Sequence, residues 1–229
     1  MRNSNTYRRW FIVFTCVLLL LIGMQASASS ASKRARQVKQ LFGILQGYSD
    51  RIEKQKKKKI YWSYSRKGVE RTFAKADARN NRKCSCAWMV NWALRDMKIL
   101  RENQTIYPNK KGELIFKKQG NTHTEEAIRK KFVLLNMGDK SPQELFQKGK
   151  LKPGDICIYK IKATHMNVFV GADQEGNLLW YDAGRVECGG GEFIEGSKKV
   201  DGKEKYVYHT FGPLIENEPI PVHQILRFK

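Results

Sequence analysis

The chain has 229 residues, and its 43 Lys and Arg against 22 Asp and Glu give a formal net charge of +21 at pH 7. This length is enough for one domain of ordinary size with an additional segment. The charge favours a polyanionic partner. The sequence has neither an RNP aromatic pair nor a Cys/His finger, so we expect no nucleic-acid partner.

Residues 1–28 have the layout of a secretory signal peptide. Three arginines precede an apolar or small run of 15 residues, Trp10–Met24, and Ala26-Ser27-Ala28 follows in an A-x-A arrangement. This run is short for a membrane span. An uncleaved N-terminal anchor is the alternative. In both cases we expect the rest of the chain to be secreted or to lie on the extracellular face of the cell envelope.

Residues 29–60 form a strongly basic segment whose apolar residues are close to helical spacing. These apolar residues are Val38, Leu41, Phe42, Leu45, Tyr48 and Ile52. We expect an amphipathic helix, which either packs on the following domain or serves as a basic arm. Outside a cell, the anionic partners of such an arm would be wall polymers or lipid headgroups.

Residues 61–229 have the composition of one globular domain, in which helices come first and an antiparallel sheet follows. Helical signals are the apolar stripe after Cys86, a mixed segment at Thr124–Leu134, and a capped start at Ser141. Strands are predicted at Gly112–Lys117, Asp155–Lys160, His165–Gly171, Leu178–Asp182 and His223–Phe228. The fold class predicted from this pattern is α+β.

Two cysteines, separated by one residue, stand at the start of the first helix predicted for residues 61–229. Cys86 is in phase with the apolar stripe, whereas Cys84 lies outside the periodic segment. The stripe consists of Met89, Val90, Ala93, Leu94 and Met97, and the polar positions are Asn91, Arg95 and Asp96. A helix N-terminus lowers the pKa of a thiol because its free N–H groups stabilise the thiolate. Periodicity therefore favours Cys86 as the activated thiol.

A nucleophilic cysteine needs a base, and the base needs an orienting group. Of the four histidines, only His165 opens a strongly apolar strand. Asp182 lies near the end of the next strand, where an antiparallel hairpin brings it close to the start of the His165 strand. We therefore predict a constellation of Cys86, His165 and Asp182.

At these residues the sequence resembles the papain-like cell-wall hydrolases, the NlpC-type and CHAP peptidase/amidase superfamily. The matching pieces, in chain order, are "CAWMVNWAL", "LKPGDICIY", "HMNVFVG" and "WYDAG". The resemblance covers roughly residues 62–184. It departs from the common Asp-Cys-Ser-Gly motif, which is Ser85-Cys86-Ala87-Trp88 here, and the third residue of the constellation is Asp where many members have His.

The resemblance implies a papain-like fold, with the nucleophile helix packed on an antiparallel sheet. It implies a secreted cysteine peptidase or amidase that cleaves an amide bond in peptidoglycan, with Cys86 as nucleophile, His165 as base and Asp182 as the orienting residue. The stretch "YWSYS" looks like the aromatic segment that lines the cleft in such enzymes, so Tyr64 is expected there together with Trp88. No cofactor or metal is implied, and we expect a monomer.

Four alternatives stay open at this point. A transglutaminase-like acyl transferase has the same Cys, His, Asp order. A catalytically inactive relative would bind the wall without cleaving it. An exported chain can also pair its cysteines in a disulfide framework, or use some of them with a histidine to bind zinc. The cysteines in question are Cys84, Cys86, Cys157 and Cys188.

Overall fold

The computed structural model of the chain describes residues 31–55, 57–58, 60, 62–64, 67–117, 124–160, 165–183, 198–200, 203–205, 213–215 and 220–229. The predicted signal peptide lies outside these residues. Within them, no helix is both long enough and apolar enough to cross a membrane.

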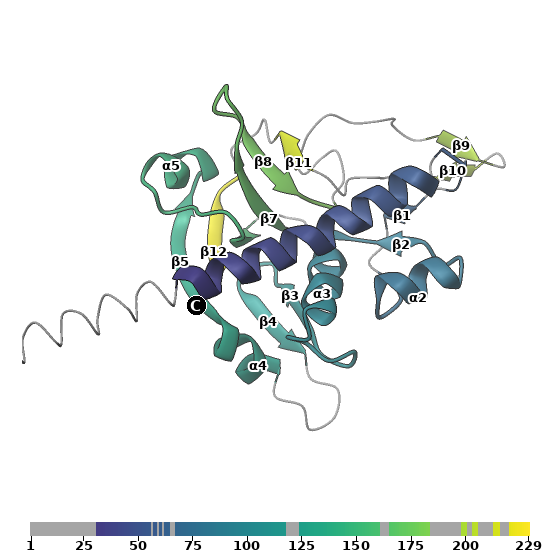
Figure 1. Ribbon diagram of the computed structural model, residues 1–229, viewed down its shortest axis with the longest axis horizontal. Helices are drawn as coiled ribbons and strands as arrows, with labels where there is room; N and C mark the ends of the chain where they lie inside the picture. Colours follow the sequence, from purple (N-terminus) through teal and green to yellow (C-terminus); the bar gives the residue numbers. More distant parts are fainter. Residues whose placement is uncertain are drawn as a thin grey trace, which may run out of the picture.

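The centre of the fold is a six-stranded antiparallel sheet with the strand order β11-β8-β7-β6-β12-β5 (Figure 1). Its strands are β5 (Phe132–Lys140), β6 (Ile156–Tyr159), β7 (His165–Ala172), β8 (Leu178–Tyr181), β11 (Pro213–Ile215) and β12 (Val222–Phe228). The three strands β6, β7 and β8 follow one another along the chain and in space. The C-terminal strand β12 then inserts between β6 and β5.

Short helices and smaller sheets surround this sheet (Figure 1). The helices are α2 (Phe73–Ala78), α3 (Cys86–Asp96), α4 (Thr124–Lys131) and α5 (Pro142–Gln147). Two-stranded sheets are formed by β1 (Ser63–Tyr64) with β2 (Lys83–Cys84), β3 (Thr105–Pro108) with β4 (Leu114–Lys117), and β9 (Lys198–Val200) with β10 (Lys203–Lys205). The helix α3 packs against β7, so a helix that begins with Cys86 lies on the strand that begins with His165.

A long N-terminal helix, residues 31–55, crosses this assembly (Figure 1). Its apolar stripe is buried in the same core as α3 and β7, through Val38, Leu41, Leu45, Tyr48 and Ile52. The Tyr181 hydroxyl of β8 donates a hydrogen bond to Gln46 Oε1 at 2.7 Å. Of the two alternatives for the basic segment, the structure shows packing on the domain.

The turn before β6 shows how close this packing is. Gly154 has φ +84°, and a Cβ atom there would lie 2.5 Å from Val38 Cγ2 of the N-terminal helix. Only glycine combines this left-handed conformation with an approach this close. The Arg34 guanidinium of the same helix donates to the Pro153 carbonyl at 2.7 Å. The N-terminal helix is therefore fitted to the turn at the start of β6.

The mixed helix and sheet content agrees with the predicted α+β class, but the order along the chain differs from the prediction. The segment Thr124–Leu134 is a helix only to Lys131, and a nine-residue strand, β5, begins at Phe132. The pairing of β5 with the C-terminal strand overrides the helical pattern there. The capped start at Ser141 is confirmed, because Ser141 Oγ accepts a hydrogen bond from the Glu144 N–H at 3.1 Å.

Candidate functional site

Cys86 is the first residue of α3 and is 3% exposed. Its predecessor Ser85 is the N-cap in an extended conformation, but its side chain makes no capping hydrogen bond. The first-turn N–H groups therefore lack the usual side-chain acceptor, and their partial positive charge is directed at the Cys86 end of the helix.

His165 and Asp182 form a direct contact under the same end of the helix. The distance from His165 Nε2 to Asp182 Oδ2 is 2.6 Å, and the two side chains are 1% and 3% exposed. The second carboxylate oxygen, Asp182 Oδ1, is buried and has no hydrogen-bond partner among the described residues. Because Nε2 faces the carboxylate, Nδ1 is the ring nitrogen left for a second partner.

That second partner is Cys86. Burial raises the pKa of the Cys86 thiol, but the charge of His165 and a hydrogen bond from it lower the pKa, and the net shift is downward. The backbone N–H of Met166 lowers it further, whereas the Asp182 carboxylate opposes this. The three residues predicted from the sequence are thus brought together as a thiol, an imidazole and a carboxylate in a chain of contacts.

Cys84 has the opposite electrostatic environment. Burial, together with the negative charge of Cys86, raises the pKa of its thiol well above the ordinary value. Cys84 Sγ donates to the Ser85 carbonyl at 3.4 Å. The pKa values of two thiols separated by one residue are therefore shifted in opposite directions, because Cys86 accepts a hydrogen bond from His165.

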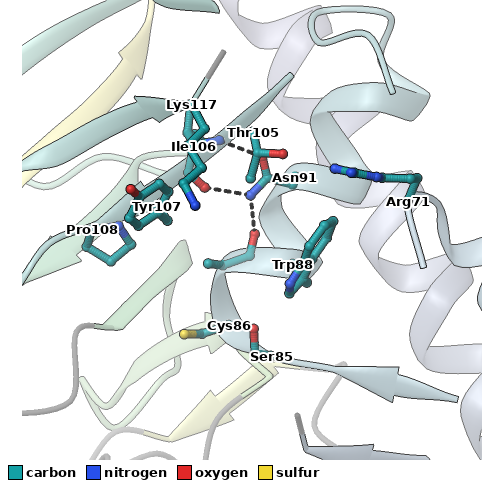
Figure 2. Close-up of a pocket in the computed structure, with 11 residues that line it drawn as sticks. Arg71, Ser85, Cys86, Trp88, Asn91, Thr105, Ile106, Tyr107, Pro108 and Lys117 are labelled. Carbon is teal, nitrogen blue, oxygen red and sulfur yellow. Dashed lines mark hydrogen bonds between the residues drawn. The ribbon is translucent and has the colours of Figure 1, made fainter. Parts of the chain in front are cut away.

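A pocket of about 360 Å³ opens beside Cys86 (Figure 2). One side is the first turn of α3 with Trp88, the second is the strand β3 with Tyr107, and two cations, Arg71 and Lys117, complete it. Trp88, which the resemblance places in the cleft, lines this pocket. Tyr64 lies in β1, whose backbone pairs with Cys84, but its side chain is outside the part of the chain described.

Two polar side chains of α3 hold the walls of this pocket together. Asn91 is fully buried, accepts a hydrogen bond from the Ile106 N–H at 2.8 Å and donates to the Ile106 carbonyl at 2.7 Å (Figure 2). Arg95 is 4% exposed and donates to the Arg71 carbonyl at 2.7 Å and to Thr105 Oγ1 at 3.0 Å. Burial lowers the pKa of Arg95 to about 10. These side chains fix β3 and the loop before α2 on α3.

The sequence analysis missed Arg71, Asn91, Arg95, Tyr107 and Lys117. Asn91 and Arg95 occupied the polar positions of the helix, where a solvent-exposed face is the usual outcome. The helix is instead covered on this side by β3, so Asn91 and Arg95 are buried with backbone partners.

The cysteine alternatives can now be compared with the structure. Cys84, Cys86 and Cys157 are free thiols, and Cys188 lies outside the described residues. Among the residues that the structure describes, no three His, Cys, Asp or Glu side chains form a group that could hold a metal ion.

Comparisons with known proteins give this chain no relative: no family model matches it, and no match was found among curated proteins or solved structures. Any assignment of chemistry therefore rests on the site. A buried thiol with a lowered pKa, an adjacent imidazole and a carboxylate on the far ring nitrogen can perform nucleophilic attack coupled to proton transfer.

Proposed function

We propose that the protein is a cysteine hydrolase that cleaves an amide bond, with Cys86 as nucleophile, His165 as base and Asp182 as the residue that orients the imidazole. The observation that supports this most strongly is the shared position of the three side chains, with His165 Nε2 2.6 Å from Asp182 and the other side of the ring on Cys86. Any buried histidine needs partners for both ring nitrogens, but a carboxylate on one side and a thiol with a lowered pKa on the other is the arrangement of a nucleophile and its base.

The reaction follows from these contacts. His165 takes the thiol proton, and the Asp182 carboxylate stabilises the imidazolium that results. The Cys86 thiolate attacks the amide carbonyl, and backbone N–H groups of the first turn of α3 stabilise the oxyanion. The imidazolium gives its proton to the leaving amine as the C–N bond breaks, and a thioester remains. His165 then takes a proton from water, whose oxygen attacks the thioester and restores the thiol.

The substrate class comes from the resemblance and from the charge. The similarity to papain-like cell-wall hydrolases, together with the signal-peptide layout of residues 1–28, favours an amide bond of peptidoglycan as the target. A net charge of +21 suits a substrate within an anionic envelope. The papain-like fold is part of the same proposal.

The test is digestion of purified peptidoglycan, with the products identified by mass spectrometry. The wild-type protein should release new amino groups and shorter peptides, Cys86→Ser should release none, and Cys84→Ser should retain most of the activity. Cys84→Ser is the matched control, because it removes a buried thiol only two residues away. Equal release by the wild type and Cys86→Ser would contradict the proposal.

The transglutaminase-like alternative predicts a different product from the same thioester. If an added primary amine replaces water, the acyl group is transferred to that amine and no hydrolysis accompanies it. Incubation with a labelled amine therefore separates the two reactions, and amine incorporation without hydrolysis would contradict the hydrolase assignment.

A further inference from the structure

The charged residues that line the pocket beside Cys86 are all positive. Two of its lining residues are cations, Arg71 and Lys117, and none of the described residues that line it is Asp or Glu. They stand on different elements, Arg71 before α2 and Lys117 at the end of β4, and lie on opposite sides of the pocket (Figure 2). The N-terminal end of α3, which carries a partial positive charge, also lines the pocket through Ser85 and Cys86.

The two cations are held in place by the fold. The loop at Arg71 is fixed to α3 through the hydrogen bond from Arg95 to its carbonyl, at 2.7 Å. The Lys117 ammonium lies 5.2 Å from the centre of the Tyr107 ring. Among the described residues, Lys117 forms no ion pair. Arg71 interacts electrostatically with Glu102, which also forms an ion pair with Lys75 at 2.6 Å.

The rest of the lining is mixed. Trp88, Ile106, Tyr107 and Pro108 supply aromatic and apolar surface, and Ser85, Asn91 and Thr105 supply polar groups. A pocket that combines apolar and aromatic surface with a few placed polar and charged groups is the usual form of a site for an organic ligand, and both charges here are positive. An arginine guanidinium matches the geometry of a carboxylate, and a lysine ammonium attracts it as a point charge.

We propose that this pocket is an anion subsite, whose cations Arg71 and Lys117 favour a carboxylate on the molecule whose amide bond Cys86 attacks. The inference takes the substrate's amide from the proposed function, but the preference for negative charge is a property of the pocket itself. It can therefore be measured without hydrolysis.

The experiment compares two alkylating reagents of almost equal size, anionic iodoacetate and neutral iodoacetamide. In both reactions the Cys86 sulfur forms an S–C bond as the C–I bond breaks and iodide leaves. Both reagents react with the same thiolate, so the ratio of their rates removes the effect of the thiol pKa and reports the charge preference of the pocket. Fragmentation mass spectrometry assigns the modification to Cys86 rather than Cys84.

The variant Arg71→Gln/Lys117→Gln should lower the ratio of the iodoacetate rate to the iodoacetamide rate about five- to tenfold, the effect expected for two partly exposed ion pairs. The matched control is Lys110→Gln/Lys111→Gln, which makes the same charge change at exposed positions of the β3–β4 turn. The control should leave the ratio within about twofold of wild type, because exposed charges farther away are screened.

A second measurement needs no variant. Raising the salt concentration should lower the ratio in the wild-type protein, because screening weakens the attraction of the cations for iodoacetate. The proposal is overturned if the pocket variant keeps the wild-type ratio, if the control variant lowers it equally, or if salt leaves it unchanged. These results do not depend on whether peptidoglycan is cleaved, so they separate a failure of this inference from a failure of the proposed function.

A last experiment asks which carboxylate of the substrate the pocket prefers. Pairs of peptides that differ only in a carboxylate or a carboxamide, at the C-terminus in one pair and at a side chain in the other, should differ in kcat/KM for the wild type. The pair whose difference disappears in Arg71→Gln/Lys117→Gln identifies the group in the subsite. If neither pair distinguishes the wild type from the variant, the pocket is not a substrate subsite.

Discussion

The contact between the N-terminal helix and the turn before β6 gives a prediction whose size follows from the structure. Replacing Gly154 by Ala puts a Cβ atom 2.5 Å from Val38 Cγ2 and 3.0 Å from Val38 Cγ1, at φ +84°. The left-handed backbone costs about 1–2 kcal/mol for a residue with a side chain. The lower entropy of the unfolded chain offsets about 0.5–1 kcal/mol of this. Overpacking adds about 1–3 kcal/mol.

The expected loss for Gly154→Ala is therefore about 1.5–4 kcal/mol in the free energy of unfolding. Gly149→Ala is the matched control, because Gly149 has φ +63° but nothing lies within 4 Å of its Cβ position. It keeps the backbone strain without the overpacking, so its loss should be about 0.5–1 kcal/mol. Urea unfolding followed by tryptophan fluorescence measures both.

A double-mutant cycle then tests the origin of the difference. Val38→Ala removes both methyl groups that the new Cβ would meet, so in the Gly154→Ala background it should restore at least about 1 kcal/mol relative to its effect in the wild type. Equal losses for Gly154→Ala and Gly149→Ala, with no coupling to Val38, would show that the N-terminal helix does not pack on this turn.

Three further predictions concern the site, the packing of β3 on α3, and the contact of α2 with the N-terminal helix. Asp182→Asn keeps an oxygen for the His165 ring but removes the negative charge, so kcat/KM for amide hydrolysis should fall roughly 10²-fold with little change in the urea midpoint; a change under threefold would contradict the orienting role. Asn91→Ala leaves the N–H and carbonyl of Ile106 without their partner and should lower the free energy of unfolding in urea by about 2–4 kcal/mol. A loss below about 0.5 kcal/mol would show that Asn91 does not hold β3 on α3. Burial raises the pKa of Asp77, but hydrogen bonds from Arg51 and Gln55 outweigh it, and the net pKa is lowered. The ionised Asp77 therefore stabilises the folded protein above the unfolded-state pKa. This contribution is lost as the pH falls through the folded-state pKa. Asp77→Asn should therefore cost about 1 kcal/mol at pH 7, and this difference from wild type should shrink below about pH 4; a constant difference would contradict it.

The candidate triad was accessible from the sequence because each part has a local signal. Cys86 begins an apolar stripe of helical period, and His165 and Asp182 belong to a hairpin of consecutive strands. A hairpin fixes the distance between residues on its two strands. His165 and Asp182, 17 residues apart in the sequence, are therefore 2.6 Å apart in the structure.

The pocket and the sheet order were not accessible in this way. The pocket needs β3 and β4 to fold over the start of α3, and no local pattern states which face of α3 they cover. The insertion of β12 between β6 and β5 joins segments about 90 residues apart. The apolar stripe of the N-terminal helix has the spacing of a buried face, but its charge left the alternative of a basic arm open until the packing was seen.

The most direct test of the site is the pH dependence of Cys86 alkylation by iodoacetamide, in the wild type and in His165→Ala. The contact with His165 lowers the pKa of the Cys86 thiol, so the wild-type rate should reach its plateau at a pH below the ordinary thiol value of about 8.5, and the inflection should move upward in His165→Ala. An inflection at or above about 8.5 in the wild type, or one that His165→Ala leaves in place, would contradict the activated thiol–imidazole pair.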